Sequence, residues 1–150
     1  MKMILRNIFY LFFPLLIGSI VGILISPNID YNNLNLPLLS PPNIVFPIVW
    51  SILYLLMGIS YFLFKKNDSF NTISIIYYIQ LFVNAMWSII FFLWNLKFFA
   101  IIWILLLDIL VILLIYLFFK KNKISAYLNI PYLLWILFAT YLTIGIYILN

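Results

Sequence analysis

The sequence contains no cysteine and no histidine. Without cysteine, the chain can form no disulfide, no thiolate metal site and no thiol nucleophile. Without histidine, it lacks the usual ligand of zinc and haem iron and the side chain that most often acts as a general base near neutral pH. We therefore expect no metal site and no resident cofactor.

Acidic residues are also scarce, because Asp30, Asp68 and Asp108 are the only three. No two of them are close in the sequence, so a pair of carboxylates for acid–base catalysis could form only through folding. None of these residue patterns indicates a nucleophile or a general base. The sequence favours a protein that is not an enzyme.

Apolar residues dominate the chain: 68% of the residues are hydrophobic and 7% are charged. The mean hydropathy of +1.24 is too high for a soluble domain of this size, so the solvent must be lipid. The apolar runs that are long enough to cross a bilayer cover residues 8–25, 43–64, 73–94, 98–119 and 125–150. We predict an all-α membrane protein, a five-transmembrane-helix bundle in one domain (residues 1–150) with a long loop between helices 1 and 2.

The first apolar run follows Lys2 and Arg6 and has some features of a signal peptide. It is longer than the apolar core of a signal peptide, and no small-x-small cleavage site precedes Pro27, so we expect a retained helix. Gly18 and Gly22 form a GxxxG motif, which allows the close approach of another backbone. Packing within the chain is the favoured interpretation, and a homodimer contact is the alternative.

All but one of the eight basic residues lie on one predicted side of the membrane. These residues are Lys2, Arg6, Lys65, Lys66, Lys120, Lys121 and Lys123. The positive-inside rule then puts the N-terminus in the cytoplasm and the C-terminus outside, with the long first loop and Lys97 also outside. The basic residues form clusters between apolar runs rather than a basic face, so we expect no nucleic-acid partner.

The long loop, residues 26–42, is rich in Asn and Pro, which favour turns. It also contains four leucines, Leu34, Leu36, Leu38 and Leu39, which are unusual in a solvated loop. These leucines indicate either a lid across the mouth of the bundle or burial against the membrane interface.

The second run carries Trp50, Tyr54, Met57 and Tyr61 within about a quarter-turn of a helix. A helix that faces only lipid needs no indole, phenol or thioether on one stripe. The stripe is either a seam that packs against a neighbouring helix or the wall of an apolar pocket for a flat ligand.

The third run places Gln80, Asn84, Trp87 and Ser88 within an arc of about 100°. Polar side chains in hydrocarbon must find partners, so this face should point into the bundle. It supplies hydrogen bonds between helices, or polar groups in a pocket, or both.

In the fourth run, Asp108 lies near the bilayer centre, where a carboxylate costs about 2.5–3.5 kcal/mol on insertion scales. No Lys or Arg lies at the same depth, so we expect a hydroxyl or amide partner, or a neutral carboxyl group. In the fifth run, Pro131 should kink the helix and free a carbonyl group.

Beyond Pro131, one face of the fifth run carries Tyr132, Trp135, Ala139 and Thr143. The last two are small and leave room for another helix or for the edge of a ligand.

Three motifs in order resemble the TspO/MBR family, also known as the tryptophan-rich sensory protein, translocator protein or peripheral-type benzodiazepine receptor family. They are PPNIVFPIVWSILYLLMG (41–58), QLFVNAMWSIIFF (80–92) and PYLLWILFATYL (131–142). With the five predicted helices and the long first loop, the resemblance covers nearly the whole chain. It implies a compact bundle that binds a tetrapyrrole or a drug-like apolar ligand in a pocket closed by the first loop.

Carried over to this sequence, the resemblance implies roles for six residues. Trp50, Trp87 and Trp135 would line the pocket, Tyr54 and Asn84 would flank it, and Ala139 would control packing beside the ligand. Leu39, Leu36 and Ile44 depart from the family pattern, which has Trp, Lys and Trp at these positions. The loop is therefore less aromatic than the family pattern.

Three classes of function agree with these features. The first is a membrane protein that binds and senses a protoporphyrin-like tetrapyrrole by stacking on indole rings. The second, which only the resemblance implies, is porphyrin degradation that depends on light and oxygen, in which Trp50 and Trp135 would react. The third is transport of porphyrins or small apolar ligands, for which Asp108 could relay a proton or bind a cation.

Overall fold

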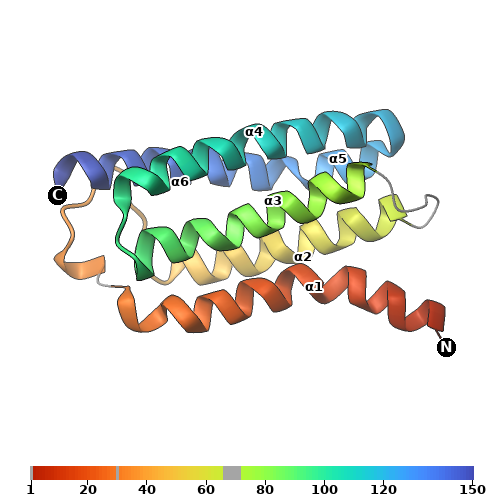
Figure 1. Cartoon of the computed structure of the whole chain (residues 1–150), viewed down its shortest axis with the longest axis horizontal. Helices are drawn as coiled ribbons and strands as arrows, with labels where there is room; N and C mark the ends of the chain where they lie inside the picture. Colours follow the sequence, from red (N-terminus) through yellow and green to blue (C-terminus); the bar gives the residue numbers. More distant parts are fainter. Residues whose placement is uncertain (1, 30, 66–71) are drawn as a thin grey trace.

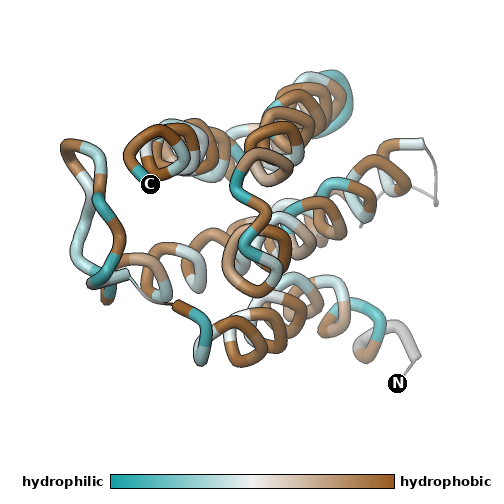
Figure 2. The backbone as a smooth tube through the Cα atoms, turned by 60° about the vertical axis from the view of Figure 1, so that its left-hand side comes forward, coloured by the Kyte–Doolittle hydropathy of each residue, from teal (hydrophilic) through white to brown (hydrophobic). Residues whose placement is uncertain are grey.

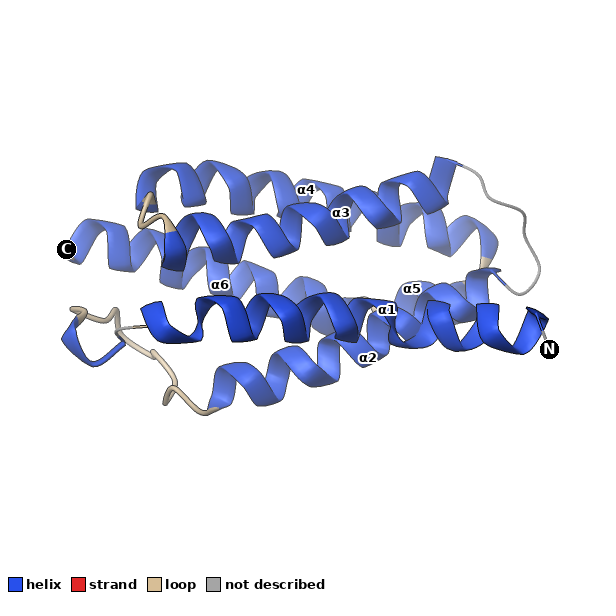
Figure 3. Cartoon of the chain, turned by 60° about the horizontal axis from the view of Figure 1, so that its bottom comes forward, coloured by secondary structure: helices blue, strands red, loops and turns tan. Residues whose placement is uncertain are grey.

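The computed structural model of the chain describes residues 2–29, 31–65 and 72–150. Asp30, Lys66 and Asp68, which contributed to the charge pattern, lie outside the described residues. The helices in chain order are α1 (Lys2–Ile25), η1 (Ser26–Asn28), η2 (Tyr31–Asn33), α2 (Val45–Lys65), α3 (Thr72–Ser88), η3 (Ile89–Leu93), α4 (Lys97–Lys121), α5 (Lys123–Leu128) and α6 (Ile130–Leu149). The described residues contain no strand (Figure 3).

Five helical stretches in the described ranges are long and apolar enough to cross a membrane, which confirms the predicted number of spans. They run side by side along the long axis of the molecule, with α1 on one side and α4 and α6 on the other (Figure 1). α1 packs mainly on α2, whereas α4 packs on α3 and α6. The protein is an all-α bundle of five membrane helices.

The outer surface of the bundle is largely apolar along the spans. Hydrophobic residues occur around the whole circumference of the helices (Figure 2). Large side chains such as Phe12, Leu16, Ile109 and Leu134 are exposed along the spans. Such a surface is stable only in lipid, because water would have to hydrate all of it.

Small residues let α1 approach α2 closely. A Cβ atom on Gly58 would overlap the backbone carbonyl of Leu11, and one on Gly18 would overlap the ring of Tyr54. Gly18 of the GxxxG motif therefore makes a packing contact within the chain. A Cβ atom on Gly22 would meet nothing within 4 Å, so the two helices are further apart there.

At the position of the predicted kink, the structure shows a break in the helix two residues before Pro131. The fifth span is divided at Asn129 into α5 and α6, and Pro131 lies in the first turn of α6, where its missing N–H leaves no hydrogen bond unmade. The buried Asn129 amide holds the break by donating to Ser60 Oγ at 2.6 Å and to the Ser125 carbonyl at 2.8 Å. The helix is therefore interrupted before the proline, at a polar anchor.

Candidate ligand-binding cavity

A cavity of about 830 Å³ lies at the end of the bundle that carries the long loop. Five parts of the chain line it: the second half of α1, the loop, the first half of α2, the end of α3 with η3, and α6. α4 and α5 contribute none of the lining residues. None of the described lining residues is charged, so the cavity is an apolar environment.

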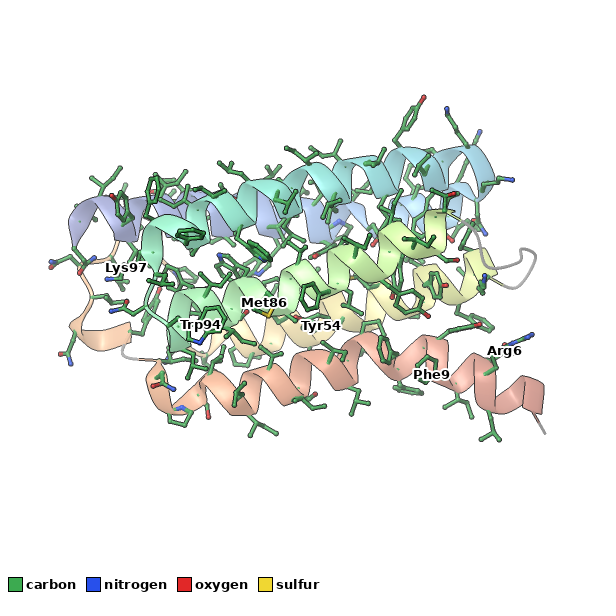
Figure 4. All side chains as sticks on the ribbon, in the orientation of Figure 1. Arg6, Phe9, Tyr54, Met86, Trp94 and Lys97 are labelled. Carbon is green, nitrogen blue, oxygen red and sulfur yellow. The ribbon has the colours of Figure 1, made fainter. Side chains whose placement is uncertain are left out.

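Four of the six residues singled out in the sequence line this cavity: Trp50, Tyr54, Trp87 and Ala139. The Trp50 ring stacks on Tyr54 with a centroid distance of 5.5 Å and lies 6.5 Å from the Trp87 ring. The predicted aromatic stripe of α2 thus continues across to α3 as one aromatic wall. Figure 4 shows Tyr54 between the helices, in the interior of the bundle.

Asn84 does not line the cavity but lies beneath its wall. It accepts a hydrogen bond from the Tyr54 hydroxyl at 2.5 Å and donates to the Tyr132 hydroxyl at 2.9 Å. Tyr132 in turn donates to Gln80 Oε1 at 2.9 Å. All four side chains are buried, so this network fixes the Tyr54 ring from behind and keeps its hydroxyl out of the cavity.

Trp135 is half-buried and is not among the lining residues. Its ring meets Phe46 edge-on at 6.0 Å, and Phe46 itself lines the cavity. Trp135 therefore stands behind Phe46 in the wall. Its indole N–H is buried and has no hydrogen-bond partner among the described residues.

Asp108 lies on α4, away from the cavity lining. The Thr140 hydroxyl donates to Asp108 Oδ2 at 2.9 Å, so a hydroxyl is the partner among the alternatives that the sequence left open. The other carboxyl oxygen, Oδ1, is buried without a partner among the described residues. Asp108 thus connects α4 to α6 rather than facing the cavity.

The long loop covers part of the cavity at one end of the bundle. Ile29, Tyr31 and Leu34 line the cavity, and the Tyr31 hydroxyl donates to the Pro41 carbonyl at 2.7 Å. Burial raises the pKa of the Tyr31 hydroxyl, and a hydrogen bond with Ser40 partly offsets this. The phenol is therefore neutral at physiological pH.

The four leucines of the loop divide into two pairs. Leu34 and Leu36 pack against the core beside Trp87 and Ala139, as a lid would. Leu38 and Leu39 are 82% and 77% exposed, at the end of the molecule where lipid headgroups would lie. The first pair is placed as a lid would be, and burial of the second pair against the membrane interface stays a prediction.

Sequence reasoning missed several lining residues. Phe46, Phe91 and Phe92 bring three more rings to the cavity, and Gly22 and Ile146 complete it on α1 and α6. Phe91 and Phe92 lie in η3, a π-helical segment that turns their side chains away from the α-helical periodicity. The QLFVNAMWSIIFF motif ends with these two residues, and this position in the motif could have identified them as lining residues.

The fold and the cavity together define an α-helical membrane protein with an aromatic chamber inside the bundle, the architecture of a membrane sensory or binding protein. The sequence model of the TspO/MBR family matches residues 10–149, and the chain belongs to this family.

Curated relatives cover most of the chain. The tryptophan-rich protein TspO of Archaeoglobus fulgidus is 38% identical over 122 residues, covering 80% of this chain and 79% of that protein. A tryptophan-rich sensory protein of Cereibacter sphaeroides is 30% identical over 79% of this chain and 75% of its own length. The protein CrtK of Rhodobacter capsulatus is 30% identical over 86% of this chain and 83% of its own length.

Proposed function

We propose that the protein binds and senses a flat apolar ligand of the tetrapyrrole class in the cavity beneath the loop. The observation that carries the proposal is the wall formed by Trp50, Tyr54 and Trp87 on one side of an uncharged chamber of about 830 Å³. Small-molecule sites typically measure about 300–1,000 Å³, and aromatic contacts add about 0.5–1.5 kcal/mol each beyond the burial of area. Stacking, rather than coordination of a metal, would hold such a ligand.

The lack of charge in the described lining restricts how a porphyrin could bind. A buried carboxylate without a cationic partner is very costly, so propionate groups must project out of the cavity or carry no charge. We therefore expect protoporphyrin dimethyl ester to bind at least as tightly as protoporphyrin. A drug-like apolar competitor should displace both.

We also propose an orientation in the membrane, with the N-terminus in the cytoplasm and the loop and the C-terminus outside. Arg6 and Lys97 lie at opposite ends of the bundle (Figure 4), and Lys65, Lys120 and Lys121 share the end of Arg6. This distribution follows the positive-inside rule. A homodimer and a single-domain organisation remain proposals from the sequence.

Fluorescence titration of the purified protein in lipid nanodiscs tests the proposed ligand. Protoporphyrin dimethyl ester should quench the tryptophan fluorescence saturably, and Trp50→Leu should weaken binding about tenfold through lost stacking and area. Trp94→Leu is the matched control, because Trp94 is 53% exposed and does not line the cavity. Equal weakening by both substitutions, or no saturation in the parent, would contradict the proposal.

The two alternative functions receive less support. Degradation of porphyrin through Trp50 and Trp135 would have one of its two indoles behind Phe46 rather than in the cavity. Transport through Asp108 would need a path from the cavity to a carboxyl group that bonds Thr140 and lies outside the lining. Binding of a ligand needs neither contact with Trp135 nor a path from the cavity to Asp108.

A further inference from the structure

The exposure of the lining residues shows where the cavity opens. On α1, on α2 and in the ends of the loop that adjoin these two helices, the lining includes exposed residues, among them Ile23 on α1 and Ile44 just before α2, which are 75% and 66% exposed. On α3, η3 and α6 every lining residue is buried or half-buried. The cavity therefore opens sideways, between the second half of α1 and the first half of α2.

This opening lies within the membrane-spanning segments. Its rim includes Ser19 and Gly22, within the span Leu5–Asn28, and Ser51, within the span Val45–Lys65. Both serine hydroxyls are already bonded to their own helix, Ser19 to the Leu15 carbonyl at 2.8 Å and Ser51 to the Pro47 carbonyl at 2.7 Å. The rim therefore presents a mainly apolar surface to the hydrocarbon.

Contacts with α6 and with Asn150, which follows it, hold the middle of the loop in place at this end of the cavity. The Asn35 N–H donates to Asn150 Oδ1, and Asn150 Nδ2 donates back to the Asn35 carbonyl, both at 3.0 Å. The Tyr141 hydroxyl donates to the Leu38 carbonyl at 2.7 Å. Pro37 also packs so closely on Gly145 that a Cβ atom there would lie 2.6 Å from it.

The gap itself exists because α1 leaves α2 after Gly18. Gly58 meets the Leu11 backbone and Gly18 meets the Tyr54 ring, whereas Gly22, one turn further, faces open space. Access from water would require breaking several hydrogen bonds of the loop. Access from the bilayer requires none to be broken.

We propose that the ligand reaches the cavity from the lipid bilayer, through the gap between α1 and α2 at Gly22, while the loop stays fastened to α6. The route rests on the proposed function, because it assumes that this cavity is the binding site. The molecules that would use this gap are flat, apolar and dissolved in the lipid.

Stopped-flow measurements in nanodiscs test the route, with protoporphyrin dimethyl ester dissolved in the lipid as the probe. Gly22→Phe and Ser51→Phe narrow the gap from its two sides, and each should slow association about tenfold and slow dissociation to a similar degree, as expected when a route is obstructed. Ile20→Phe is the matched control, because Ile20 is 55% exposed on α1 but does not line the cavity. It should leave both rates unchanged.

A second variant tests the opposite route. Asn150→Ala combined with Tyr141→Phe removes the side-chain hydrogen bonds of Asn150 and Tyr141 to the loop, and it should leave the association rate unchanged. Faster association in this variant, or parental association rates in both rim variants, would overturn the route while the binding site stands. Faster dissociation without slower association in the rim variants would show that the new rings fill the cavity, which also overturns it. No saturable binding in the parent would overturn the proposed function and the route together.

Discussion

At the scale of single residues, Trp50 and Trp135 are two indoles that the sequence could not tell apart. Both lie on inward-facing stripes, yet only Trp50 lines the cavity, and Trp135 stands behind Phe46. The position of Trp135 follows from the geometry of α6. Trp135 is rotated by about 60° from Tyr132 around the helix axis, so the two side chains of the same predicted stripe have different surroundings. Tyr132 is fully buried in the network under the wall.

We predict that Trp135→Phe changes the affinity for protoporphyrin dimethyl ester by less than about threefold, because no ring contact with the ligand is lost. Its indole N–H has no described hydrogen-bond partner, so its removal leaves none unpaired. Titration by quenching of the remaining tryptophans measures this. A loss as large as that of Trp50→Leu would mean that Trp135 touches the ligand directly.

Asn84 is expected to act on stability more than on contact with a ligand. Asn84→Leu removes the acceptor of the Tyr54 hydroxyl and the donor to Tyr132. A buried polar group left unpaired costs about 1–3 kcal/mol, so the thermal midpoint in detergent should fall. Tyr54→Phe is the control: the double variant Tyr54→Phe, Asn84→Leu should lose less than the sum of the single changes. Additive losses would contradict the network.

At the scale of helices, the five spans could be predicted because each is a long apolar run with few charges. The division at Asn129 could not, because it depends on Ser60 and Ser125, which come from different parts of the sequence. The π-helical segment η3 was missed for a similar reason, since α-helical periodicity predicts no extra residue in a turn. The inward faces of α2 and α3 were predicted well, because polar and aromatic side chains have no reason to face lipid.

The packing of α1 on α2 gives a prediction with a matched pair of glycines. Gly58→Val should push α1 away from the Leu11 contact and lower the thermal midpoint by several degrees, the effect of an overpacked interface of about 1–3 kcal/mol. Gly22→Val should have little effect, because its Cβ atom meets nothing within 4 Å. Thermal unfolding in detergent compares the two. Similar losses in both variants would show that the packing of α1 on α2 is sensitive to a side chain at either glycine, whatever the space around it.

At the scale of the whole molecule, the uncharged cavity predicts that binding of a neutral ligand does not depend on pH. Burial raises the pKa of Tyr31, so the folded state favours the neutral phenol, and deprotonation becomes relevant only above its ordinary value of about 10. The affinity for protoporphyrin dimethyl ester should therefore be constant between about pH 6 and 9. Titrations across this range measure it, and a step near neutral pH would indicate an ionised group in contact with the ligand.

A structure of the protein determined with bound protoporphyrin dimethyl ester tests the central claim most directly. We predict that the macrocycle lies in the cavity between α1, α2, η3 and α6, with one face against the rings of Trp50 and Trp87. A macrocycle bound on the outer surface of the bundle, with this cavity left unoccupied, would contradict the account.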